Sequence, residues 1–496
     1  MFLKSGYSLL GDLVSGEGCG ANVRNCLAFF SSRVFRGRAR VIIALVILLN
    51  VVFLTLLPDR LSGIIFGREF GTLLRFKGAD RGRGGGLRIV SFGSPDLAMG
   101  SERRNSGNSK SWTEYLCDEL SCSSYLSFVP QVDSRTPDPV LISNSLYKEA
   151  VDNLLAQNFS ADEPGFNYTW LRDQYPVPTH ADLGSQVSSF LNSRRPKDPP
   201  KETLWVFNFG AWDVWNLAAL PRESAEKVID YMVLHLFERI ELLYRASLSD
   251  ESIAFSDFWG YSSPEVIKKL QSNTLSDTRD EMETFRVLIP ETIDISITPG
   301  WTDQRPRPPS PHSLAVHMTN AAYLTERWNN AVKAHTTEWE KLPNPSLDEV
   351  DTNHRAEARS KKRSVERVEE PLYAPFPRRK ALVFNAPEFV LEAIIEKQMH
   401  DTELVDTTGR GTRPDNDPLT FSEVAHPCVG FDENGVAQRC ASPDGYLFQT
   451  SFALGGKAMR EVAKRGSEKA RETLYLAEPQ PAAAQVGSVE KSESSR

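Results

Sequence analysis

Two carboxylates spaced one residue apart, Asp415 and Asp417 in the segment PDNDP, form a pair that could hold a metal ion. Oxygen ligands of this kind suit hard divalent cations, and in a type II membrane protein of the Golgi such a pair can serve a sugar-nucleotide transferase. The pair also lies in a loop rich in Pro and Asp, with no strand pattern of a donor-binding domain before it, which is typical of an ordinary turn. Both interpretations stay open on the sequence.

The chain has six cysteines, and four of them fall into two local pairs. Cys117 and Cys122 are close in CDELSC, and Cys428 and Cys440 are close in CVGFDENGVAQRC. An oxidising compartment would convert such neighbours into disulfides that close small loops, whereas a reducing one would leave free thiols. A zinc site is disfavoured because neither spacing is CxxC.

Two further groups of residues are suited to carbohydrate. Asn158 in NFS and Asn167 in NYT are acceptors for N-glycosylation in a secreted domain. Tryptophans near the predicted strand ends could line a sugar-binding groove, although packing in the core is the commoner use of this side chain. These tryptophans are Trp205, Trp212, Trp215 and Trp301.

An apolar segment near the N-terminus predicts a membrane anchor. Residues 41–57 read VIIALVILLNVVFLTLL without a charge, which reaches the lower length limit for a helix that crosses a bilayer. Four arginines precede the segment and only Asp59 and Arg60 follow closely, so the charge bias places residues 1–40 in the cytosol. The rest of the chain would face the lumen of the ER or Golgi, or the exterior, as in a single-pass type II protein. A cleaved signal peptide is the alternative interpretation.

The elements that must position these groups are those of an α/β domain. Short apolar segments alternate with helical patterns, which predicts a parallel sheet covered on both faces, because parallel neighbours need a crossover connection. The predicted strands are residues 87–92, 124–130, 204–209, 285–289 and 381–385, and the predicted helices are residues 111–120, 146–157, 224–245, 321–339, 386–397 and 456–470.

Composition sets the boundaries and excludes one class of partner. The domain spans residues 87–475, preceded by a flexible stem at 58–86 and followed by a disordered tail at 476–496, with a charged disordered insertion near 350–380. The net charge of -8 argues against a nucleic-acid partner, because such a protein needs a concentrated basic face.

Four segments, taken in order along the chain, resemble the motif blocks of the SGNH (GDSL-type) hydrolases. They are VSFGSPDLA (90–98), FNFGAWDVW (207–215), VLIPETIDISITPGW (287–301) and PDGYLFQTSFALGG (443–456). The last two are similar to fungal members in particular. The resemblance implies a three-layer α/β/α flavodoxin-like parallel sheet, ester hydrolysis by a serine, carbohydrate or acylated glycan as the ligand class, and no cofactor.

The resemblance also assigns candidate site residues. In that family a serine after the first strand attacks the ester, a G-x-N-D block supplies oxyanion donors, and an Asp and a His near the C-terminus supply the base. The residues that fall on or beside these positions are Ser94, Asp96, Gly210 and Asp213.

Four other positions of the family's site carry residues that cannot perform the chemistry. Pro95 stands at the position of the nucleophile and Trp212 at that of the Asn, while Thr450 and Ala453 replace the Asp and the His. Proline has no hydroxyl and alanine takes no proton, and loss of the amide donor alone raises the barrier by about 2–4 kcal/mol. We therefore expect reduced or absent esterase activity and a binding or assembly role.

Two alternatives stay open. An active carboxylic-ester or carbohydrate-ester hydrolase would need a non-standard nucleophile and a histidine brought in from the C-terminal part. The nucleophile or its orienter would be Ser91, Ser94 or Asp96, and the base His400 or His426. A type II glycosyltransferase would instead bind its metal through Asp415 and Asp417.

Overall fold

The structure is a computed structural model that describes residues 85–94, 110–130, 137–157, 167–276, 278, 281–345, 374–431, 437–474 and 476. All of them belong to one unit of the chain, residues 74–496. Several predictions fall outside these ranges, namely the membrane segment 41–57 with its flanking tail and stem, Pro95, Asp96, Asn158, most of the charged insertion and the C-terminal tail. Among the helices that the structure describes, none combines the length and apolarity needed to span a bilayer.

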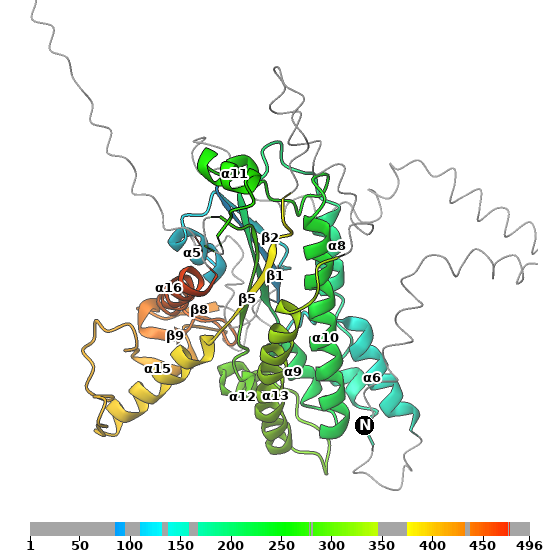
Figure 1. Ribbon diagram of the computed structural model, residues 1–496. Coiled ribbons are helices and arrows are strands. Elements are labelled where there is room, and N and C mark those ends of the chain that lie inside the picture. Colours follow the sequence, from blue (N-terminus) through cyan, green and yellow to red (C-terminus); the bar gives the residue numbers. More distant parts are fainter. Residues whose placement is uncertain are drawn as a thin grey trace, which may run out of the picture. The chain divides into compact units, whose positions relative to one another are not determined.

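Five parallel strands form the central sheet, in the order β2-β1-β3-β4-β5 (Figure 1). The strands are β1 (Leu87–Gly93), β2 (Ser124–Ser127), β3 (Glu202–Asn208), β4 (Thr284–Pro290) and β5 (Arg378–Phe384). The register aligns Val90 of β1 with Leu126 of β2 and Trp205 of β3. The predicted α/β class with a parallel sheet is confirmed, and the strand order is compatible with a flavodoxin-like fold.

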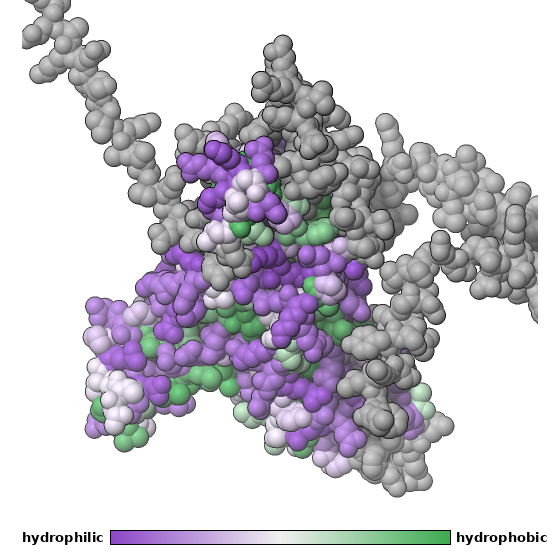
Figure 2. Space-filling model, viewed as in Figure 1, coloured by the Kyte–Doolittle hydropathy of each residue, from purple (hydrophilic) through white to green (hydrophobic). Residues whose placement is uncertain are grey.

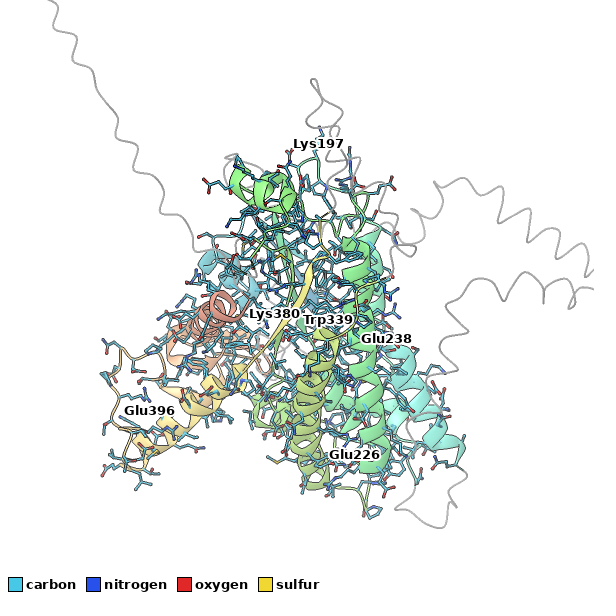
Figure 3. The ribbon with its side chains drawn as sticks, in the orientation of Figure 1. Lys197, Glu226, Glu238, Trp339, Lys380 and Glu396 are labelled. Carbon is cyan, nitrogen blue, oxygen red and sulfur yellow. A yellow bond between two sulfur atoms is a disulfide. The ribbon has the colours of Figure 1, made fainter. Side chains whose placement is uncertain are left out.

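Long helices cover one face of the sheet. They are α6 (Asn144–Ala156), α8 (Leu183–Leu191), α10 (Arg222–Ser247) and α13 (Leu314–Glu340). Their apolar stripes form one core with strand residues such as Val90, Phe92 and Phe207. Figure 3 labels Trp339 at the end of α13 and Lys380 on β5, where Lys380 pairs with Glu340 at 3.7 Å.

A second set of helices covers the opposite face. These are α5 (Trp112–Glu119), α15 (Ala386–Asp401) and α16 (Gly456–Thr473), and their core includes Ile89, Leu204 and Leu288. Helix α5 begins at a capping box, in which the Ser111 hydroxyl accepts from the Glu114 amide and the Glu114 carboxylate accepts from the Ser111 amide. Successive strand side chains point alternately into the two cores. The face of the molecule seen in Figure 2 is mostly hydrophilic.

Several short elements were not predicted from the sequence. Four are helices, α7 (Leu171–Gln174), α9 (Ala211–Leu217), α11 (Pro264–Gln271) and α12 (Pro299–Gln304), and three are 3-10 turns at Trp259–Tyr261, Ile295–Ile297 and Pro443–Gly445. Two small sheets follow α15, one pairing β6 (Glu423–Pro427) with β9 (Tyr446–Phe448), the other pairing β7 (Val429–Phe431) with β8 (Ala437–Arg439). These elements are too short for a hydrophobic period to be read from sequence.

Strand β5, Arg378–Phe384, begins three residues before the end of the insertion predicted near 350–380. Arg379 is only 8% exposed, and its guanidinium donates to the Glu241 carboxylate of α10 at 3.0 and 3.1 Å. It also lies over the Tyr244 ring, 3.9 Å from the centroid. The charge that suggested a solvated insertion is therefore neutralised by a helix from another part of the chain.

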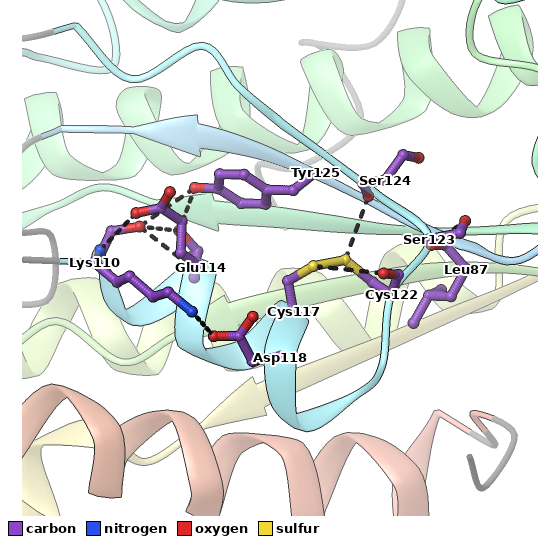
Figure 4. The surroundings of a disulfide bond; sticks show 11 residues. Leu87, Lys110, Glu114, Cys117, Asp118, Cys122, Ser123, Ser124 and Tyr125 are labelled. Carbon is purple, nitrogen blue, oxygen red and sulfur yellow. Dashed lines mark hydrogen bonds and ion pairs between the residues drawn. A yellow bond between two sulfur atoms is a disulfide. The ribbon is translucent and has the colours of Figure 1, made fainter. Parts of the chain in front are cut away.

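The two predicted disulfides are confirmed. Cys117 and Cys122 join the end of α5 to the start of β2, with their Cα atoms 5.0 Å apart (Figure 4). Cys428 and Cys440 close the β7–β8 hairpin, with a Cα separation of 4.9 Å. In the same region the Ser123 amide donates to the Leu87 carbonyl at 2.7 Å, so the first disulfide fixes the approach to an edge strand of the sheet.

Replacement of both Cys428 and Cys440 by serine is expected to lower the free energy of unfolding by about 2–3 kcal/mol, because the closed loop restricts the unfolded chain. Urea unfolding of oxidised protein measures the difference. Wild-type protein treated with a reductant should show the same loss plus that of the Cys117–Cys122 bridge. Equal stability of oxidised and reduced wild type would contradict the expectation.

Candidate functional site

The predicted catalytic turn begins where β1 ends, and its backbone is held from two sides. The Gly93 amide donates to Gln186 Oε1 at 2.9 Å, and Gln186 Nε2 donates back to the Gly93 carbonyl at 3.0 Å. Ser94 is fully buried, with its amide 2.9 Å and its hydroxyl 3.4 Å from the Asn208 carbonyl oxygen of β3. The structure thus places the Ser94 hydroxyl inside the protein rather than at an open cleft.

Gly210 stands at the end of β3 in a backbone conformation that requires glycine. Its φ is 118°, which other residues rarely adopt, and a Cβ there would overlap the Thr292 hydroxyl and lie 2.7 Å from the Trp328 ring. Thr292 in turn donates its hydroxyl hydrogen to the Phe209 carbonyl at 2.9 Å. The absence of a side chain at Gly210 therefore allows the ends of β3 and β4 to approach each other closely.

Asp213 lies in the first turn of α9, directly after Gly210, and is fully buried. Its Oδ1 accepts a hydrogen bond from the Ile142 amide at 3.0 Å, just before α6 begins. A carboxylate in the first turn of a helix is favoured by the helix dipole. The described contact is structural, because it ties the segment before α6 to the end of β3.

The C-terminal block folds as a tight turn. The carbonyl of Ala453 accepts from the amides of Gln449 at 2.8 Å and Thr450 at 3.3 Å, and both Thr450 and Ala453 are 4% exposed. The Gly300 amide of α12 donates to the Ser451 carbonyl at 2.9 Å. A Cβ on Gly300 would collide with the Phe452 ring, so this glycine lets the turn dock on α12.

Four aromatic side chains fill the space where these blocks meet, and we call them the aromatic plug. They are Trp212 and Trp215 of α9, Trp301 of α12 and Phe452 of the turn. The Phe452 ring centroid lies 4.9 Å from that of Trp212 and 5.4 Å from that of Trp215, and Trp215 meets Trp301 edge-on at 5.5 Å. None of the four is more than 8% exposed.

The plug decides between two hypotheses for the tryptophans. Trp212, Trp215 and Trp301 are core residues, as is Trp205 at 1% exposure, so they do not line an open sugar-binding groove. Edge-to-face packing of buried rings is a favourable use of aromatic surface. At the position where the resemblance expects an amide donor, Trp212 offers a ring packed on Phe452.

A buried arginine sits against the plug. Arg305, which follows α12, is 5% exposed, and its guanidinium carbon lies 4.0 Å from the Trp301 ring centroid, 4.7 Å from that of Trp215 and 5.0 Å from that of Tyr175. Its Nη1 donates to the Trp215 carbonyl at 2.8 Å. Burial lowers the pKa of Arg305 to about 10, so the side chain stays a cation at neutral pH.

His317 is the only histidine of the described ranges that is almost fully buried, at 2% exposure. Its Nδ1 lies 3.4 Å from Arg305 Nη2, and the indole of Trp170 stacks on the imidazole with ring centroids 5.9 Å apart. Burial, reinforced by the neighbouring Arg305 charge, lowers the pKa of His317 to about 3. The imidazole is therefore neutral at physiological pH, with Nδ1 placed to accept from the guanidinium.

The histidines proposed as rescuing bases lie on the surface. His400 is 63% exposed and its Nδ1 is 3.7 Å from Asp401, while His426 is 77% exposed and 3.3 Å from Glu423. Ser91 and Ser94, the hydroxyls they would activate, are fully buried. This geometry does not favour the alternative of an active hydrolase, because a base must lie within hydrogen-bonding reach of its nucleophile.

The proposed metal pair belongs to a turn. Asp417 Oδ1 accepts from the Leu419 amide at 2.9 Å, and its Oδ2 lies 3.7 Å from Arg413 Nη1. Lys457 Nζ donates to the Asp417 carbonyl at 3.0 Å, and Asp415 is exposed. No cluster of three or more His, Cys, Asp or Glu able to hold a metal occurs among the described residues. The turn interpretation accounts for all of these contacts.

A small cavity of about 20 Å³ lies at the opposite edge of the sheet, where β3 and β4 begin. Its charged lining is already engaged, because Arg286 pairs with Glu202 at 3.4 Å and the Trp259 indole donates to Glu283 at 2.9 Å. Ligands of open α/β sheets bind at the carboxyl edge. The cavity therefore does not replace the plugged edge as a site.

The carboxyl edge of the sheet brings together the segments to which the resemblance assigned a site, and their aromatic side chains are packed in the core. Sequence reasoning found Gly210, Asp213 and Trp212 but missed Arg305, His317 and Phe452. Arg305 begins the proline-rich segment RPRPPSPHS, whose composition is typical of an extended loop, and the only hint of its burial is Trp301 four residues before it.

Comparison with known proteins adds no assignment to this geometry. No protein-family model matches the chain, and no curated protein is similar enough to it to count as a relative.

Proposed function

We propose that the chain is a single-pass membrane protein of the secretory pathway whose SGNH-like domain has little or no esterase activity and serves in binding or assembly. The observation that carries the proposal is the aromatic plug, which occupies the carboxyl edge of the sheet with side chains that cannot transfer protons. The finer three-layer SGNH-like architecture is part of the proposal. It is supported by motif order and by the 2-1-3-4-5 strand order.

The plug argues against catalysis on energetic grounds. Serine hydrolysis needs an activated hydroxyl and donors aimed at the oxyanion, and each lost donor raises the barrier by about 2–4 kcal/mol. Opening the plug would expose three tryptophans and a phenylalanine to water, which costs about 1.5–3 kcal/mol for each large apolar side chain. The closed edge is therefore the stable state, and an ester has no access to Ser94.

The disulfides support the lumenal part of the proposal. Two local cystine bridges are typical of an oxidising compartment, and both lie on the C-terminal side of the predicted anchor. This is the orientation that the arginines before residue 41 also favour.

A fluorophosphonate probe, which labels activated serines covalently, tests the catalytic part. We expect no labelling of the full chain, in membranes or solubilised in detergent, because the Ser94 hydroxyl is buried and the candidate bases His400 and His426 lie on the surface. Gel fluorescence beside an active serine hydrolase at equal concentration gives the comparison.

The Ser94→Ala variant provides the control. Labelling of wild type that disappears in Ser94→Ala would refute the proposal and establish an active hydrolase. Labelling that persists in Ser94→Ala but is lost in Ser91→Ala would refute it through the other candidate hydroxyl.

A further inference from the structure

The second predicted glycosylation acceptor lies on the surface in an ordered turn. Asn167 is exposed, and its Oδ1 accepts from the Thr169 amide at 3.1 Å and from the Thr169 hydroxyl at 2.7 Å. Its side-chain nitrogen, the atom to which an N-glycan is attached, donates no hydrogen bond to any residue that the structure describes. The amide is therefore available for modification.

Three partly exposed rings surround the backbone of this same residue, and we call them the aromatic shelf. They belong to Tyr168, Trp170 and His312. Trp170 Nε1 donates to the Asn167 carbonyl at 3.0 Å, and His312 Nε2 lies 3.2 Å from the same oxygen. The His312 centroid is 4.7 Å from that of Tyr168 and 5.5 Å from that of Trp170.

The shelf is fixed to the core beneath it. Trp170 stacks on the buried His317 and meets the Tyr175 ring at 6.1 Å, and both of these neighbours contact Arg305. Gln174 Nε2 also donates to the Arg307 carbonyl at 3.1 Å, which ties the loop that carries His312 to α7. The rings thus form a rigid partly apolar surface that ends at Asn167.

We propose that Asn167 carries an N-linked glycan and that its first N-acetylglucosamine packs its apolar ring face on the aromatic shelf. The inference rests on the proposed lumenal location, because glycosylation requires translocation of the domain. A pyranose ring presents aliphatic C–H groups that gain dispersion and weak C–H contacts with aromatic faces.

The shelf fits the chain's own glycan better than a free sugar. Because the attachment point lies within one residue of Tyr168 and three of Trp170, the first sugar is held near the rings at an effective concentration of about millimolar or higher. At that effective concentration, a contact too weak to bind free carbohydrate is sufficient to hold the attached sugar on the shelf. The shelf area would be covered in the glycosylated protein.

The test uses the full chain with Asn158→Gln, made in a eukaryotic secretory host, so that Asn167 is the only acceptor of the two. Intact mass should show one N-glycan. Tyr168→Ser, which keeps an Asn-x-Thr sequon, and His312→Ala should each speed enzymatic removal of the glycan from the folded protein by about fivefold, as expected for the loss of one aromatic contact. Tyr231→Ser, at a tyrosine 62% exposed on α10, is the matched control and should leave the rate unchanged.

The outcomes separate this inference from the proposed function. The packing of the glycan on the shelf is refuted if wild type carries a glycan on Asn158 but none on Asn167. It is also refuted if the glycan is removed at the same rate from all variants. Both results leave the lumenal location intact. Absence of any glycan together with reduced cysteines overturns the lumenal location itself. If a shelf variant fails to fold, the melting temperature of the Asn158→Gln protein is measured before and after removal of the glycan. The melting temperature should fall by about 2 °C if the sugar packs on the shelf, and should not change otherwise.

Discussion

Replacement of Arg305 by alanine is expected to lower the free energy of unfolding by about 3–5 kcal/mol, the range seen when large buried side chains are truncated. The guanidinium fills the space between Trp301, Trp215 and Tyr175, and no carboxylate is among its described partners. Its charge is stabilised instead by ring faces, at about 2 kcal/mol for a desolvated cation–π contact. Equilibrium urea unfolding followed by far-UV circular dichroism measures the loss.

Two further variants identify which property of Arg305 matters. Arg305→Met keeps most of the volume but leaves the Trp215 carbonyl and His317 Nδ1 without their donor, so we expect an intermediate loss of about 1–3 kcal/mol. Arg307→Ala removes an exposed arginine two residues away and should change stability by less than about 0.5 kcal/mol. If Arg305→Ala were as stable as Arg307→Ala, the guanidinium would not support the plug.

The three inner strands β1, β3 and β4 could be predicted from the sequence because each is a short, largely apolar run buried on both faces. LWVFNF and FRVLI have this character, and both appear as strands within two residues of the expected bounds, at Glu202–Asn208 and Thr284–Pro290. The start of β5 was not predicted, because the charged sequence RRK is typical of a solvated segment. Only the tertiary contact of Arg379 with Glu241 of α10 shows that this segment belongs to the sheet.

The candidate site was predicted in part for a similar reason. Gly210 and Asp213 follow the strongest strand directly, so motif spacing alone located them. The aromatic plug joins α9, α12 and the 450–453 turn, which are more than 80 residues apart along the chain, and no local pattern reports such a contact. The same holds for Arg305 and His317, whose burial depends on Trp170 and Tyr175 from an earlier segment.

The domain is expected to lose stability in mild acid through His317. The pKa of this buried imidazole is about 3 in the folded protein and near 6.5 in the unfolded chain, so the unfolded state binds more protons between these values. The free energy of unfolding is therefore highest above pH 6.5 and falls as the pH drops toward 3, with a slope of up to about 1.4 kcal/mol per pH unit. From pH 7.5 to pH 4.5 this one group should remove roughly 2–3 kcal/mol.

His317→Asn isolates this contribution, because an Asn oxygen can accept from Arg305 near the place of Nδ1 and does not titrate. Other groups titrate in the same window, so the informative quantity is the difference between variant and wild type at each pH, measured by urea unfolding. The variant should be less stable than wild type at pH 7.5, where the imidazole packs under Trp170, and should close most of that gap at pH 4.5. His426→Asn, at a surface histidine, should follow wild type throughout. Parallel pH curves for His317→Asn and wild type would show that His317 has the same pKa in the folded and unfolded states. Burial beside Arg305 would then not keep the imidazole neutral, and the interpretation of His317 as a neutral partner of Arg305 would be wrong.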